Sequence, residues 1–236
     1  MELTDAMRTA GAVRDFTDEP VARELLWQVL DHARFAPSGG NQQGWRVVVL
    51  EDPHLRAQLR DAYLPAWYEY LAMRSAGIRP WAPPNDPAAE QRAIAEGAAP
   101  ARAQAEAGGG GFAEHLDQVP VVLAVLVDLG TLAAVDRDAE RYSFAGGASI
   151  YPFVWNLLLA ARDLGLAGVM TTMAIREEAT VLELLGAPEH HALAAVVALG
   201  HPVHQPRRLR RRPVEEFTTI DRVDGEPLRA PEPDRP

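Results

Sequence analysis

The chain has 236 residues, of which 47% are hydrophobic and 24% charged, a composition typical of a globular protein with a buried core. A formal net charge of -10 disfavours binding to nucleic acid or to an anionic membrane surface. The absence of cysteine excludes disulfides, thiolate metal sites and cysteine nucleophiles. Because the N-terminus lacks the basic start and apolar run of a signal peptide, we expect a cytoplasmic protein with no membrane association.

The length fits one large domain, and the first third is predicted to be mainly helical. Helical patterns cover residues 3–9, about 23–35 and 55–70, and a buried strand is expected at 46–50. The second helix carries an apolar stripe that includes Leu26, Val29 and Ala33. Residues 36–41 end this helix, because proline cannot continue it and glycine, serine and asparagine favour turns.

The rest of the chain predicts an α+β layered domain, with helices packed on a central apolar sheet. Residues 76–111 are rich in Ala, Pro and Gly, and they are interpreted as a mobile helical insertion or lid, with a disordered loop as the alternative. Strands are expected at 120–127, 168–173 and 193–199, helices at 147–163 and 176–185, and an extended, proline-rich arm from residue 202.

The segment from Ala36 to Trp45 is the first candidate for a binding site. It joins a helix to a strand through small residues, and it offers backbone amides, the Ser38 hydroxyl and the carboxamide of Asn41. Such neutral donors and acceptors suit the edge of a flat heterocycle or a ribityl chain. Its chemistry alone leaves a plain polar turn as the simpler interpretation.

Several segments, taken in order, change that interpretation, because together they resemble the nitroreductase family. Each segment alone is a weak signal, but they follow the family's order over most of the chain, leaving out the insertion at about 63–117 and the tail. The resembling segments are Val13-Arg14-Asp15-Phe16 with Pro20-Val21, residues 36–45, residues 156–161 with Leu164-Gly165-Leu166, residues 184–188 with 198–202, and Arg211-Arg212-Pro213 before Glu215-Glu216.

The resemblance implies a nitroreductase-like three-layer α+β fold, with a central mixed β-sheet flanked by helices, in a homodimer. It also implies one domain over 1–224, with the helical or lid insertion at about 63–117, and a proline-rich tail at 225–236. Each of two sites in the subunit interface would bind one FMN. Electrons would pass from NADH or NADPH through the flavin to an acceptor in a ping-pong mechanism.

The resemblance also implies which residues contact the flavin. No metal site is predicted. Arg14 would supply a fixed positive charge beside reduced flavin, since guanidinium stays protonated, although an isolated arginine would more often pair with Asp15 or Asp18. Thr171 or Thr172 would donate to the flavin edge where hydride arrives. The full predicted set is Arg14, Pro37, Ser38, Asn41, Met170, Thr171, Thr172, Arg210 and Arg211.

The arginine run at 207–212 has three interpretations: a solvated cluster, a nucleic-acid site, or an anchor for the FMN phosphate. Nucleic-acid binding is disfavoured by the acidic chain. Arginine forks match phosphate geometry, and we expect Arg211 to bind the phosphate, with Arg210 as the next candidate.

The chain departs from the family at Ala10-Gly11-Ala12, where the family usually has two arginines and a serine that hold the phosphate and ribityl hydroxyls. Losing one hydrogen bond to a charged group, at ~1.5–3 kcal/mol, costs about tenfold or more in affinity. Backbone amides around Gly11 or the C-terminal arginines are the expected compensation. Gly44, where the family usually has proline, is a milder departure.

The sequence therefore predicts an FMN-dependent NAD(P)H oxidoreductase that reduces a flat, electron-poor acceptor of the nitroaromatic or quinone type. Two alternatives remain open: a flavin-binding or sequestering protein without turnover, and a specialised FMN-dependent dehalogenase or dehydrogenase. A flavin-free structural relative is the least favoured interpretation. The histidine pairs 190–191 and 201/204 could suggest a metal, but the second pair lies in a proline-flanked extended segment without acidic residues nearby, and a surface or turn role is favoured. No G-x-G-x-x-G follows a strand.

Overall fold

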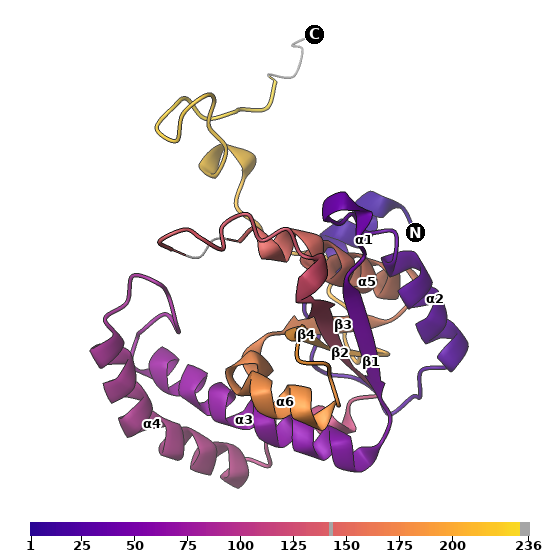
Figure 1. Ribbon diagram of the computed structural model, residues 1–236, viewed down its shortest axis with the longest axis vertical. Coiled ribbons are helices and arrows are strands. Elements are labelled where there is room, and N and C mark those ends of the chain that lie inside the picture. Colours follow the sequence, from indigo (N-terminus) through magenta and orange to yellow (C-terminus); the bar gives the residue numbers. More distant parts are fainter. Residues whose placement is uncertain (142–143, 232–236) are drawn as a thin grey trace.

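The computed structural model describes residues 1–141 and 144–231, and it has the α+β architecture that the sequence predicts (Figure 1). The strands are β1 (Trp45–Leu50), β2 (Val121–Asp128), β3 (Ala167–Thr171) and β4 (His191–Gly200). The helices are α1 (Leu3–Thr9), α2 (Arg23–Ala33), α3 (Pro53–Ser75), α4 (Pro87–Ala107), α5 (Tyr151–Asp163) and α6 (Glu178–Leu184), with short 3-10 segments between them.

The four strands form one sheet in the order β1-β2-β4-β3, and every neighbouring pair is antiparallel. The parallel component of the predicted mixed sheet is limited, within residues 1–141 and 144–231, to one bridge between Ala12 and Gly168. There the Val13 amide donates to the Gly168 carbonyl over 3.0 Å. The N-terminal segment therefore lies along the outer edge of β3.

The sheet is covered on both faces, which makes the molecule three-layered. Alternate residues of a strand point to opposite faces, so each strand contributes to two separate apolar cores. On one face, α2 and α5 pack against β2 and β4, and on the other face α3 and α6 do so. Because both faces are covered, β2 is buried over seven consecutive residues, from Val121 to Val127.

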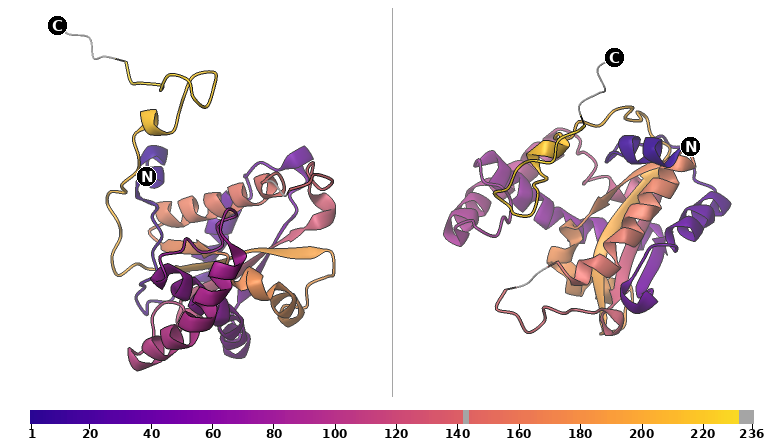
Figure 2. Two further views of the ribbon diagram at one scale, coloured as in Figure 1. Left: turned by 90° about the vertical axis from the view of Figure 1, so that its left-hand side faces the viewer. Right: turned by 90° about the horizontal axis from the view of Figure 1, so that it is seen from above.

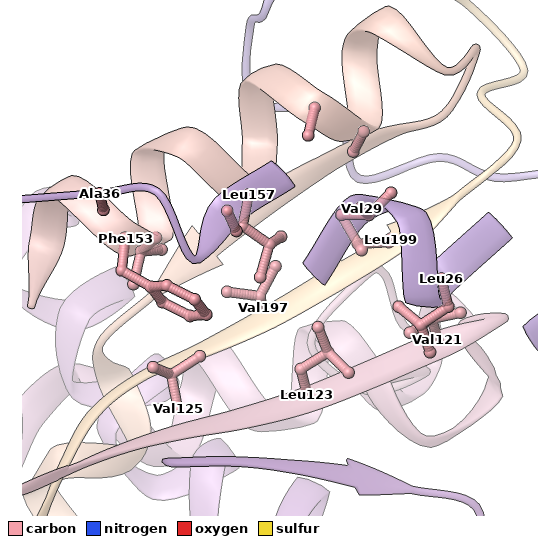
Figure 3. Packing of buried hydrophobic residues seen from close by; sticks show 14 of the residues in the cluster. Leu26, Val29, Ala36, Val121, Leu123, Val125, Phe153, Leu157, Val197 and Leu199 are labelled. Carbon is pink, nitrogen blue, oxygen red and sulfur yellow. The ribbon is translucent and has the colours of Figure 1, made fainter. Parts of the chain in front are cut away.

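The core between α5 and the sheet fixes the position of that helix (Figure 3). Phe153 and Leu157 project from α5 toward Val125 and Val197 on β2 and β4, and all four are buried. Phe153 also stacks on Trp45 of β1, with ring centroids 4.9 Å apart. These contacts hold α5 across the sheet, so that its two ends reach different parts of the molecule.

Much of the region predicted as an insertion is helical, and α4 (Pro87–Ala107) contradicts the disordered-loop alternative for that part. Its first part, from residue 63, belongs to the single long helix α3, which begins where Asp52 accepts from the His54 amide over 2.7 Å. Its second part contains α4, which returns alongside α3 (Figure 1). Gly97 allows the close approach, since a Cβ there would lie 2.8 Å from Ala72 Cβ.

The C-terminal arm begins on the body of the protein and then leaves it. Val203 N donates to Asp15 O over 3.1 Å, which ties the first arm residues to the N-terminal segment. Farther along, the arm extends away from the sheet and helices (Figure 2). It carries exposed apolar side chains, including Val214, Phe217 and Ile220. No helix within residues 1–141 and 144–231 is long and apolar enough to cross a membrane.

The core contact of α5 gives a first prediction. Leu157→Ala should lower the free energy of unfolding by about 2–5 kcal/mol, because it removes a fully buried side chain and leaves a cavity. Urea denaturation would measure the change. Leu129→Ala is the matched control, since Leu129 is 49% exposed, and it should change stability far less. Equal effects of the two substitutions would contradict this account of the core.

Candidate functional site

A cavity of about 250 Å³ lies where the N-terminal segment, the C-terminal half of α5, β3 and the start of the arm meet. It contains three of the predicted site residues, Arg14, Met170 and Arg211, although they lie far apart in the sequence. The remaining walls are Ala10, Gly11, Ala12, Trp155, Leu158, Arg162, Ala167, Gly168, Val169 and Gln205. The altered segment Ala10-Gly11-Ala12 therefore borders the predicted flavin residues.

Three guanidinium groups, from Arg14, Arg162 and Arg211, line this cavity. None of the three forms an ion pair with a carboxylate in the described ranges 1–141 and 144–231. The alternative that Arg14 pairs with Asp15 or Asp18 is therefore wrong. Three positive charges without carboxylate partners create a local potential that favours an anion, even in a chain with a net charge of -10.

Thr9, the last residue of α1, holds two polar side chains of the cavity, those of Arg162 and Gln205. Arg162 Nε donates to Thr9 Oγ1 over 3.0 Å, and Gln205 Nε2 donates to the Thr9 carbonyl over 3.0 Å. Gln205 Oε1 is buried and accepts no hydrogen bond within residues 1–141 and 144–231. Since buried polar atoms are generally paired, this oxygen is an acceptor available to a bound group.

The C-terminal arm approaches the backbone closely at Gly11. A Cβ on Gly11 would lie 2.8 Å from Leu209 Cδ2 and 3.5 Å from Pro206 Cγ. A side chain at this position would require the end of the Leu209 side chain to move. Residues 206–209 of the arm therefore pack directly against Gly11.

The end of β3 places the next group of predicted residues near the buried Tyr63. Met170 is 39% exposed, Thr172 is exposed, and Thr171 is half-buried. Thr171 Oγ1 donates to the Tyr63 hydroxyl over 3.2 Å. Burial raises the pKa of Tyr63, with a smaller opposing contribution from its hydrogen bond to Thr171. Tyr63 therefore remains a neutral phenol at physiological pH and orients the Thr171 hydroxyl.

The turn that carries Ser38 and Asn41 has a fixed and partly strained shape. Ser38 Oγ accepts from the Gln43 amide over 2.9 Å, and the Gly39 amide donates to Ser149 Oγ over 3.0 Å. Asn41 and Gln43 have φ values of 54° and 53°, in the left-handed region that non-glycine residues rarely adopt. The turn thus exposes its polar groups in one defined arrangement.

Gly44, which departs from the family's usual proline, lies under a neighbouring loop. A Cβ at Gly44 would overlap with the side chain of Thr131, whose hydroxyl donates to the Asp128 carbonyl over 2.7 Å. The glycine at position 44 therefore leaves the space that the Thr131 side chain occupies.

One chain does not bring all the predicted site residues together. Pro37, Ser38 and Asn41 do not line the arginine cavity. Their turn precedes β1, and two strands, β2 and β4, lie between β1 and β3 in the sheet. The three strand spacings from β1 to β3 add up to about 14 Å. The turn contacts Ser149 before the N-terminal end of α5, whereas Arg162 lies at the C-terminal end of this helix, which is about 20 Å long.

Arg210 is exposed and also lies outside the cavity lining, although its carbonyl accepts from Arg211 Nη1 over 2.8 Å.

Two polar cavity residues, Arg162 and Gln205, were not predicted. Arg162 follows the apolar stripe of a helix and looks like an ordinary solvated charge, and Gln205 lies in an extended segment. No local pattern marks either residue. Their role appears only when α5, α1 and the arm converge on Thr9.

A second cavity, of about 600 Å³, shares Arg14 with the first. It lies between the segment that follows Arg14 and the segment that leads from α4 to β2. Its wall combines the aromatic rings of Phe16 and Phe112 with the polar side chains of His115 and Gln118. Arg14 therefore stands between a basic cavity and a larger, partly aromatic one.

Comparison with known proteins agrees with this fold and with the sequence signature. The model of the family described as "Nitroreductase family" matches residues 8–201. A Thermus thermophilus protein named NADH dehydrogenase is 29% identical over 231 residues, covering 86% of this chain and 88% of that protein. The chain therefore belongs to the nitroreductase family, a family of FMN-binding oxidoreductases.

Solved structures support the same fold. A BluB-like flavoprotein from Clostridium difficile superposes with a TM-score of 0.65 at 20% identity, covering 94% of this chain and all of the other. Iodotyrosine deiodinase, solved with FMN and 3-iodo-L-tyrosine, superposes with a TM-score of 0.61 at 21% identity, covering 90% of this chain and 96% of the other. At sequence identities of 20% and 21%, these two comparisons show a similarity of fold only.

The bond between the turn and α5 gives a second prediction. Ser149→Ala should free the Gly39 amide and destabilise the turn by about 1 kcal/mol, and the exchange of that amide with deuterium should become roughly fivefold faster. Amide hydrogen exchange measured residue by residue would detect it. Ser75→Ala at the exposed end of α3 is the control. Unchanged exchange at Gly39 would show that Ser149 does not hold the turn.

Proposed function

We propose that this protein is an FMN-dependent oxidoreductase of the cytoplasm that passes electrons from NADH or NADPH to a flat, electron-poor acceptor. The observation that carries the proposal is the cavity next to the strand that ends in Thr171, whose three guanidinium groups have no carboxylate partner among the residues that the structure describes. Family membership supports FMN as the group that this donor set would hold.

The residues of the cavity fit the polar part of FMN. A phosphate carries charge and acceptor oxygens that arginine forks match, and the buried Gln205 Oε1 requires a donor such as a hydroxyl. A volume of about 250 Å³ is below the usual size of a whole ligand pocket, roughly 300–1,000 Å³. The cavity therefore suits the phosphate and ribityl chain, and it leaves the flavin ring outside.

FMN, when bound, supplies the hydride and electron transfer, and the chain supplies binding, orientation and charge. Arg211 would bind the phosphate, and Arg14 would place a permanent positive charge beside the flavin, favouring its reduced, more negative form. Thr171 and Thr172 would offer hydroxyl or amide donors to the reacting edge, with Met170 against the ring. The burial of Tyr63 keeps the Thr171 hydroxyl oriented.

Pro37, Ser38 and Asn41 would complete the site from a second copy of the chain. In a two-fold dimer the same surface of each copy faces the other, so the turn at one end of α5 meets the partner's cavity at the opposite end. The exposed side chains of Tyr151 and Trp155 on α5, 38% and 43% exposed, support this face as the interface. The dimer would then contain two equivalent flavin sites.

The acceptor would occupy the space beside Arg14 that is lined by Phe16 and Phe112. Aromatic walls suit a flat nitroaromatic or quinone. A second candidate is a reductive dehalogenase, which the fold shared with the deiodinase complex favours. A flavin-binding protein without turnover is the remaining alternative, motivated by the absent arginine pair at Ala10-Gly11-Ala12.

The purified protein should show the visible absorption bands of oxidised flavin, and the released cofactor should be FMN by chromatography. It should then oxidise NADH or NADPH steadily when a quinone or nitroaromatic is added. A flavin that NADH and NADPH fail to reduce would favour the sequestering alternative. Turnover with a halogenated phenol but with neither other acceptor would favour the dehalogenase, and a protein that binds no flavin would refute the proposal.

The dimer gives a separate prediction. Deleting residues 214–236 keeps Arg211 but removes the exposed apolar arm residues, so it should convert dimer to monomer at micromolar concentration. Sedimentation velocity would measure the change. Deletion of 232–236 alone is the control and should leave the dimer intact. A dimer that survives the longer deletion would show that the arm does not hold the subunits together.

A further inference from the structure

Two polar cavity residues lie outside the segments that resemble the family: Arg162 on α5 and Gln205 in the arm. We propose that Arg162 binds the FMN phosphate in place of the arginines missing at Ala10-Gly11-Ala12, and that Gln205 Oε1 accepts a hydrogen bond from a ribityl hydroxyl. This assignment rests on the proposed function and specifies how the flavin is held.

The contacts of Arg162 leave it free to bind an anion. Its Nε is engaged by Thr9 Oγ1 at 3.0 Å, and its terminal nitrogens have no hydrogen-bond partner in the part of the chain that the structure describes. The neighbouring Asp163 does not neutralise it, because that carboxylate pairs with the N-terminal ammonium group. A guanidinium anchored through Nε presents its two terminal nitrogens as a fork, the geometry that phosphate oxygens match.

The amide of Gln205 is oriented by its own hydrogen bonds. Nε2 donates to the carbonyls of Thr9 at 3.0 Å and Pro206 at 3.4 Å. Carbonyl oxygens only accept, so the amide cannot be reversed, and Oε1 is the atom without a partner in the described part of the chain. A ribityl hydroxyl would donate to it, which is the role that the family's serine loses at Ala12.

Thr9 couples the two residues through hydrogen bonds to both. Its hydroxyl donates to the Asp5 carbonyl over 2.6 Å while accepting from Arg162, and its carbonyl accepts from Gln205. The last turn of α1 is thus the common anchor of a residue from α5 and one from the arm. The small side chains at 10–12 leave the space between them open.

Binding of FMN and of riboflavin, which lacks the phosphate, separates the two roles. Both dissociation constants would be measured by flavin fluorescence on the apoprotein. Arg162→Met should weaken FMN binding by about tenfold or more and leave riboflavin binding within about twofold. Gln205→Leu should weaken both flavins by the same factor, because both carry the ribityl chain.

Two control variants separate the geometry of the Arg162 side chain from its charge and from the net charge of the protein. Arg162→Lys retains the charge without the fork and should fall between wild type and Arg162→Met. Arg23→Met removes one positive charge from an exposed ion pair with Glu51, outside the cavity, and should leave both constants unchanged. Riboflavin affinity serves as the internal check that the Arg162 variants fold, and circular dichroism provides that check for Gln205→Leu.

The outcomes distinguish this assignment from the proposed function. An unchanged ratio of FMN to riboflavin affinity in Arg162→Met would overturn the phosphate role, and unchanged binding of both flavins in Gln205→Leu would overturn the ribityl role. Either result could occur in a protein that binds FMN well. A wild-type protein that binds neither flavin would overturn the proposed function together with this assignment.

Discussion

The packing of α5 on the sheet is the contact on which the rest of the site depends. Phe153 and Leu157 lock the helix against β2 and β4, and Phe153 also stacks on Trp45. This core contact fixes both ends of the helix at once. One end holds the turn through Ser149, and the other presents Arg162 to the cavity. A rigid helix of about 20 Å therefore sets the distance between the two halves of the predicted site.

The elements were predictable from the sequence because their signals are local. The helix at 3–9 and the apolar stripe of α2 follow from residue spacing, and the buried strands β2 and β4 follow from continuous apolar runs. The order of the family segments predicted the fold class. The length of α3 was underestimated at both ends, because Pro53 and the Asp52 cap start it before residue 55 and the helix continues past residue 70 to Ser75.

The site was only partly predictable, because its contacts join segments that are distant in sequence. Arg14, Met170 and Arg211 were assigned by resemblance, and the structure places them around one cavity. Arg162 and Gln205 carry no local signal, and their importance depends on a shared partner, Thr9. The departure at Ala10-Gly11-Ala12 was visible in the sequence, but the packing of the arm against Gly11 is a tertiary contact that the sequence does not show.

The course of the arm links assembly to cofactor supply. Gln205 and Arg211 line the cavity, and the exposed apolar residues that follow belong to the same continuous segment. Under the proposed function, ordering this segment for one ligand lowers the entropic cost of ordering it for the other. Thermodynamic linkage then requires that FMN tighten the dimer by the same factor by which the dimer tightens FMN. A cell short of flavin would thus hold this protein increasingly as separate subunits.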